Sequence, residues 1–187
     1  EDNKDRWIML LDINTGGLKL LDRQHDNAWI GGPGIGYGQL GWLSDNKNIY
    51  FQSEESGFSH LYLLDVTMGQ KKALTSGNYE IYNLNLSNDK KTWYFISNET
   101  DPGIRELYRM PVQGGPKIHL TNFGGGVEYD LSPDEKYIAL RVSKSNMPWD
   151  LYVMENKEKA VPVRIIESTT PEFNAYNWRV PEFIKFK

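Results

Sequence analysis

The chain has 187 residues, 39% of them hydrophobic and 25% charged, which is the composition of an ordinary folded globular protein rather than of a disordered one. Its 21 basic and 25 acidic residues give a net charge of −4 without a run of Lys or Arg, and this argues against a nucleic-acid partner. Because the chain has no cysteine and its three histidines lack a His-x-x-x-His spacing, we predict no disulfide, no metal site and no cofactor.

The first predicted elements are two short strands within residues 6–22. Their sequence, "RWIMLLDINTGGLKLLD", matches the later stretch "SHLYLLDVTMGQKKALT", with Asp12 in the place of Asp65. The apolar run at 7–11 is far shorter than the ~20 residues of a membrane-spanning helix, and no secretion signal precedes it. We therefore expect no membrane span, and we expect residues 1–30 to be half of a repeating unit whose other half lies upstream in a longer natural protein.

Three longer segments after residue 36 repeat one another. An internal period of ~40 to 50 residues is typical of propellers and repeat arrays. Aspartates in a turn are 44 and 45 residues apart, and tyrosines in a later strand are 46 and 44 apart: Asp45, Asp89 and Asp134; Tyr62, Tyr108 and Tyr152. A Leu-Thr pair at 74–75 recurs 46 residues later at 120–121. Three landmarks thus give the same period.

Each module is predicted to contain four strands. The first strand ends at Ser-x-Asp, where the aspartate accepts hydrogen bonds from backbone amides two residues on and holds a tight turn. The second strand, as in "NIYFQS" and "TWYFIS", is apolar or aromatic on both faces, as expected for a sheet that is covered on both sides. A polar loop, a third strand ("HLYLLD", "ELYRMP"), a glycine turn and a short fourth strand ending in Leu-Thr follow.

Four antiparallel strands in every ~45 residues indicate an all-β fold, a β-propeller fragment of about three and a half four-stranded antiparallel blades. A β-sandwich accounts equally well for short strands, but it does not account for the repeated landmarks. The predicted units are a half blade at 1–30 and blades at about 37–81, 82–126 and 127–168. Because this number of blades leaves a ring open, apolar faces stay uncovered, which allows self-association and leads us to expect further blades.

Taken together, "FQSEESGFSHLYLLD", "YFISNETDPGIRELYRM", "YDLSPDEKYIALRVS" and the terminal "PEFIKFK" resemble the C-terminal half of the propeller domain of dipeptidyl peptidase IV-like serine peptidases, in the prolyl oligopeptidase family. The resemblance implies that 169–187 is a linker and first strand toward an α/β-hydrolase domain outside this chain. It also implies a parent exopeptidase acting on peptides, in which the propeller gates access and contributes substrate contacts. A periplasmic or extracellular location is implied in the same way.

Ser59, in "EESGFSHLY", has the first part of a Gly-x-Ser-x-Gly nucleophile elbow. The last glycine of that motif is replaced by Leu61, and a strand rather than a helix follows. We therefore interpret Ser59 as a turn residue and His60 as a hydrogen-bonded strand residue, and we predict no catalytic residue in this chain. The Glu54-Glu55 pair offers two carboxylates, but the resemblance places the amine-binding glutamates of the family upstream, so that role is not transferred.

The glycine-rich stretch "GGPGIGYG" at 31–38 leads into a strand, whereas a dinucleotide-binding loop would lead into a helix. The resemblance places this loop toward the substrate, although it lacks the arginine found there in the family. We predict Trp29, Ile35 and Tyr37 as substrate or pocket contacts; the alternative is an ordinary blade-entry loop.

The function that these observations predict is that of a non-catalytic propeller fragment of a dipeptidyl peptidase IV-like serine exopeptidase. Its expected partners are the peptide substrate, the α/β-hydrolase domain and the remaining blades. The alternative is a stand-alone protein-binding propeller without enzymatic activity.

Overall fold

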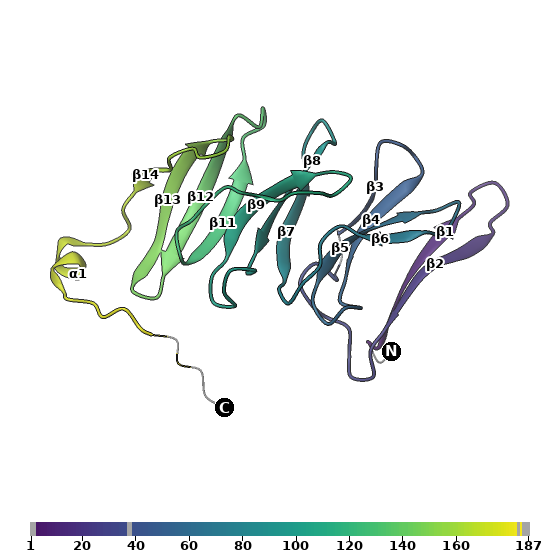
Figure 1. Ribbon diagram of the computed structural model, residues 1–187, viewed down its shortest axis with the longest axis horizontal. Coiled ribbons are helices and arrows are strands. Elements are labelled where there is room, and N and C mark those ends of the chain that lie inside the picture. The colour runs from purple at the N-terminus through teal and green to yellow at the C-terminus, as the bar shows by residue number, and fades with distance from the viewer. Residues whose placement is uncertain (1–2, 37–38, 183, 185–187) are drawn as a thin grey trace.

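The computed structural model describes residues 3–36, 39–182 and 184, and in this part of the chain the strands form four antiparallel sheets in chain order (Figure 1). Sheet one contains β1 (Asp5–Leu11) and β2 (Leu18–His25). Sheet two contains β3 (Leu40–Trp42), β4 (Asn48–Ser53), β5 (His60–Asp65) and β6 (Lys71–Ala73). Sheet three contains β7 (Ile81–Leu86), β8 (Thr92–Ser97), β9 (Glu106–Pro111) and β10 (Ile118–His119). Sheet four contains β11 (Gly126–Leu131), β12 (Tyr137–Lys144), β13 (Met147–Glu155) and β14 (Val163–Ile166).

The architecture confirms the all-β, propeller-like prediction, with an open rather than a closed arrangement. Strands pair with their neighbours in chain order within every sheet, so each sheet is an up-and-down meander. A short helix, α1 (Pro171–Ala175), follows sheet four and is capped by the Thr170 hydroxyl. The first strand that we predicted toward a hydrolase domain falls mainly on residues 183 and 185–187, which lie outside the described residues.

The turn aspartates act as predicted. Oδ1 of Asp45 accepts from Lys47 N at 2.9 Å, and Oδ1 of Asp134 accepts from Lys136 N at 3.2 Å. The Ser132 hydroxyl and this amide lower the pKa of Asp134 to about 2. Because this folded-state pKa lies below the ordinary value of about 3.9, the carboxylate stabilises the fold above that pH. Its contribution is lost as the pH falls toward about 2.

Over the described residues, the core consists of three apolar clusters, one between each pair of adjacent sheets. Between sheets two and three, Leu61 and Leu63 pack with Trp93 and Phe95, and both aromatic side chains are fully buried. Full burial of side chains this large contributes about 1.5–3 kcal/mol each from the area removed from water. The sheets are therefore held face to face by apolar contact.

The two outermost faces lack such a partner in the described part of the chain. On sheet one, Trp7, Met9 and Leu11 alternate outward while Ile8 is buried against sheet two. On sheet four, the burial of β12 alternates residue by residue, whereas β8 of sheet three is buried almost throughout. This difference arises because sheet three has a neighbour on each side and sheet four has one.

In each four-stranded sheet, a hydroxyl group after the fourth strand forms a hydrogen bond with a polar side chain of the third strand, which is the first residue of β5 and of β9 and the fourth residue of β13. The pairs are Thr75 with His60 at 3.0 Å, Thr121 with Glu106, and Ser168 with Asp150 at 2.8 Å. The fourth strands end one residue before the Leu-Thr pairs, contrary to our prediction that they include them. The reason is that the amide of Leu107 donates its hydrogen bond to the hydroxyl of Thr121, at 2.9 Å, and not to a backbone carbonyl of the fourth strand.

Removing one of these hydroxyls should destabilise the fold. Thr121→Val keeps the side-chain shape but leaves the Leu107 amide and one oxygen of the buried Glu106 without their partner, so we expect a loss of about 2–3 kcal/mol in the free energy of unfolding. Thr100→Val, at an exposed loop position, is the control and should change it by less than about 0.5 kcal/mol. Equal values from denaturant titration of the two variants would contradict the role of the hydroxyl.

Candidate functional site

Two kinds of connection lie at one end of the structure: those that join the second and third strands of a four-stranded sheet, and those that join one sheet to the next. This follows from the meander, because alternate connections of antiparallel strands fall at the same end. The connections are 26–36, 54–59, 74–80, 98–105, 120–125 and 145–146, which lie toward the lower edge of Figure 1. The chain after β14 leaves toward the same end, because β14 is antiparallel to β13. We call this the loop end.

The glycine-rich connection at 26–36 has a defined conformation. Oδ1 of Asp26 accepts from the amides of Ala28 at 2.7 Å and Trp29 at 3.2 Å, which forms a tight turn at its start. The amide of Ile30 then donates to the Asn3 carbonyl at 2.8 Å. The loop is thereby tied to the chain segment that precedes β1.

Ser59 fixes the middle of this loop. Its side chain is fully buried, and its Oγ donates to the Pro33 carbonyl at 2.5 Å. Nε2 of Gln52 donates to the Ser59 Oγ at 3.1 Å, and the Ser59 amide donates to Glu80. A nucleophilic serine needs an accessible oxygen and a basic acceptor for its proton, and here the proton is directed at a backbone carbonyl.

His60 is also engaged in structural contacts. The ring is fully buried, with Nδ1 3.0 Å from the Thr75 hydroxyl and Nε2 2.9 Å from the Gly77 carbonyl. The edge-on ring of Tyr79 lies 4.9 Å away. The interpretation of Ser59 and His60 as structural residues therefore fits their surroundings.

Gly34 allows the loop to lie directly on Gln52. Its φ is +69°, in the left-handed region, and a side chain at this position would collide with the Gln52 amide. Only glycine combines this backbone conformation with this close approach.

The three predicted contact residues have different positions. Trp29 is 71% exposed at the loop end, whereas Ile35 is 6% exposed and lines a cavity of about 340 Å³ together with Asp5 and Arg6. Tyr37 lies outside the described residues. The contact role of all three stays a prediction.

Arg6 is a neighbour of this loop that sequence reasoning missed. Its Nη1 donates to the Gln52 carbonyl at 2.8 Å, and burial lowers the pKa of its guanidinium, with Asp22 opposing that shift. In the sequence it appears only as one more charge before a strand, so no local signal marks it.

Glu55 of the Glu54-Glu55 pair is held in an ion pair. It binds Lys71, whose Nζ also lies 2.7 Å from Asp22 in sheet one. Lys117 and Glu99 form the equivalent pair in sheet three. Since the arrangement recurs with the repeat, it links strands within the blade, and Glu55 is occupied by a cation of the protein itself.

The repeated meanders, stacked face to face with their loops gathered at one end, define this chain as part of a β-propeller. Residues 2–149 match the family model described as the dipeptidyl peptidase IV (DPP IV) N-terminal region, and the chain belongs to this family. The resemblance inferred from the repeated motifs is thus confirmed.

Curated relatives agree with this assignment. The chain is 30% identical over 166 residues to dipeptidyl peptidase 4 of Trichophyton equinum, covering 86% of this chain and 21% of that protein. It is 27% identical over 153 residues to dipeptidyl peptidase 4 of Arthroderma otae, covering 80% and 19%. The chain therefore spans about a fifth of the length of the relatives it matches, and it is related to dipeptidyl peptidases.

Among solved structures, TolB from Acinetobacter baumannii is similar, with a TM-score of 0.54 and 21% sequence identity. The match covers 88% of this chain and 38% of that one. At this identity the likeness shows the fold alone.

Substituting Gly34 should disturb the loop. Gly34→Ala places a side chain at positive φ and against Gln52, so we expect the free energy of unfolding to fall by about 2 kcal/mol or more. Gly36→Ala, where a side chain would meet open space, is the matched control and should stay near the parent value. Thermal unfolding of both variants tests this, and equal midpoints would show that Gly34 does not lie on Gln52.

Ser59→Ala should affect stability rather than chemistry. It removes a buried donor to Pro33 and an acceptor for Gln52, which we expect to cost about 1–2 kcal/mol and to speed proteolytic cleavage within 26–36. Ser56→Ala, at an exposed position of the same turn, is the control. If limited proteolysis cleaved both variants within 26–36 at the same rate, the proposed role of Ser59 in holding this loop would be refuted.

Proposed function

We propose that this chain is the C-terminal half of the propeller of a dipeptidyl peptidase IV-like serine exopeptidase. The observation that carries the proposal is the family match over residues 2–149, supported by relatives that bear the name dipeptidyl peptidase 4. In this proposal the chain supplies no catalytic residue. The serine, aspartate and histidine that perform acyl transfer belong to an α/β-hydrolase domain beyond this chain.

The proposed contribution of the chain is to restrict access and to contact the peptide at the loop end. Hydrogen bonds from Asp26 and the buried Ser59 hold the 26–36 loop, and the exposed indole of Trp29 projects from it. Ile35 lines the neighbouring cavity with Arg6. A preformed surface binds a peptide without a large ordering cost, and we propose Trp29, Ile35 and Tyr37 as its contact residues.

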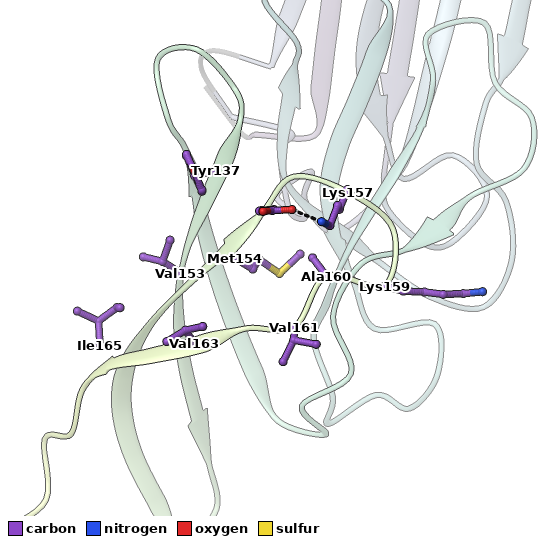
Figure 2. A pocket seen from close by; sticks show the side chains of 10 residues that line it. Tyr137, Val153, Met154, Lys157, Lys159, Ala160, Val161, Val163 and Ile165 are labelled. Atoms are coloured by element: carbon purple, nitrogen blue, oxygen red, sulfur yellow. Dashed lines mark ion pairs between the residues drawn. The ribbon is translucent and has the colours of Figure 1, made fainter.

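We further propose that the remaining blades of the ring cover the two outer faces. A cavity of about 500 Å³ on sheet four is lined mainly by apolar side chains, including Tyr137, Val153, Val163 and Ile165. In Figure 2, Val153 and Ile165 lie on the side of the sheet turned away from the rest of the protein, with the Lys157–Glu155 ion pair above them. The equivalent faces of sheets two and three are covered by the next sheet.

We propose an extracytoplasmic location, in the periplasm or outside the cell, from the relation to dipeptidyl peptidases. In the described residues, no helix is long and apolar enough to span a membrane.

The test uses the complete product of the gene and hydrolysis of glycyl-prolyl-p-nitroanilide. We expect turnover by the complete product and none by residues 1–187 alone. Trp29→Ala should raise KM about three- to tenfold with little change in kcat, because it removes binding that is common to ground and transition states. Trp42→Ala, an exposed tryptophan at the opposite end of its sheet, is the control.

Absence of turnover, together with no Gly-x-Ser-x-Gly motif encoded downstream, would overturn the proposal in favour of a binding propeller without enzymatic activity. Turnover with an unchanged KM in Trp29→Ala would keep the enzyme assignment and remove Trp29 from the contact surface.

A further inference from the structure

A second concave region lies at the loop end, away from the 26–36 loop. A cavity of about 490 Å³ between sheets three and four is lined by Tyr82, Arg105 and Glu128, among others. A second cavity of about 390 Å³ lies between the β12–β13 turn and the C-terminal segment, at Phe173 and Trp178. Ser143 and Trp149 line both cavities, so the two lie next to each other, and we call them together the Trp149 groove.

Both ends of the groove are ordered by local contacts. At the first end, the Arg105 amide donates to the Gly125 carbonyl at 2.8 Å, and its guanidinium lies 4.5 Å from the Tyr82 ring. At the second end, the Trp178 indole donates to the Phe173 carbonyl at 2.9 Å, with ring centroids 4.6 Å apart. The groove therefore presents pre-oriented side chains rather than freely rotating ones.

The unneutralised charges of the groove are positive. Glu128 is paired with Arg141 at 3.0 Å, and the Arg141 guanidinium lies over Trp149. Among the described residues, no carboxylate lies within ion-pair distance of Arg105 or of Lys144, which lines the second cavity. In a protein with a net charge of −4, this places two exposed cations beside four aromatic rings, those of Tyr82, Trp149, Phe173 and Trp178.

We propose that the Trp149 groove binds an acidic segment of a peptide. Arg105 and Lys144 pair with carboxylates of the peptide, because a guanidinium stacked on an aromatic ring keeps its N–H edge free for a carboxylate. Trp149, Phe173 and Trp178 contact the apolar side chains between them. Each cavity falls within the size range of ordinary ligand sites, roughly 300–1,000 Å³.

This inference rests on the proposed function, since it takes the peptide to be a substrate of the parent enzyme and the groove to bind it beyond the N-terminal dipeptide. The groove lies at the same end as the 26–36 loop and the departing chain. The proposal therefore predicts that the parent enzyme binds longer peptides with acidic residues more tightly than longer peptides without them. A dipeptide substrate is too short to reveal this preference.

The test is equilibrium binding to the complete gene product, measured by fluorescence anisotropy. The probes are two nonapeptides, Gly-Pro-Gly-Ser-Gly-Asp-Leu-Asp-Gly amide and its Asn-Leu-Asn counterpart, each with the bond after proline reduced to CH2–NH and with a neutral fluorophore. We expect the Asp peptide to bind about fivefold more tightly at low salt. The preference should shrink as the salt concentration rises from about 50 to 500 mM, because screening weakens exposed ion pairs.

Arg105→Gln should reduce the preference for the Asp peptide to near one while leaving binding of the Asn peptide unchanged. Arg105→Lys should restore part of it, and Lys47→Ala, an exposed cation at the opposite end, is the control. Equal binding of the two peptides by the parent protein, or a preference that survives in Arg105→Gln, would overturn the proposal.

Hydrolysis of glycyl-prolyl-p-nitroanilide, measured on the same samples, separates the two proposals. Normal hydrolysis without an acidic preference refutes the groove alone. An Arg105-dependent preference without hydrolysis supports a groove for acidic peptides and refutes the peptidase assignment.

Discussion

The structure depends on one constraint, which is that the apolar faces of the sheets are buried by packing against neighbouring sheets. Trp93 and Phe95 of β8 face sheet two, while Tyr94 and Ile96 of the same strand face sheet four. A strand with this pattern has no polar side and is stable only between two neighbours. The constraint explains why the sheets follow one another face to face, and why exposed apolar residues collect on the outer faces of sheets one and four.

Because apolar contacts between strands hold the sheets together, the connecting loops are not needed for this packing and can have other functions. Alternate connections lie at one end, where the 26–36 loop, the Trp149 groove and the departing chain lie. Two groups of residues can be distinguished there. Ser59, Gln52 and Glu55 have partners within the protein and maintain its geometry, whereas Arg105, Lys144 and Trp29 are exposed.

Much of the fold was predictable from sequence because its landmarks are local. Each turn aspartate accepts a hydrogen bond from the amide two residues further on, so the spacing between these aspartates along the chain equals the length of the repeat. The role of Ser59 was predictable only in part. Its sequence excluded a nucleophile elbow, but the carbonyl that it contacts belongs to Pro33, 26 residues away. Arg6 and Arg105 were missed because each acts through a residue on another strand or loop, and no short-range pattern records such contacts.

The sequence by itself determined the strand order, the turns, the repeat and the family. The reason is that backbone turns and alternating burial depend on residues that are close together in the sequence. Only the tertiary structure decided which polar groups form hydrogen bonds or ion pairs within the protein and which remain exposed. The clamp of Ser59 on Pro33 and the ion pair of Lys71 with Asp22 join residues from separate sheets or from a loop between them. Such contacts depend on how the sheets stack, and that stacking is a property of the packed chain rather than of any one segment.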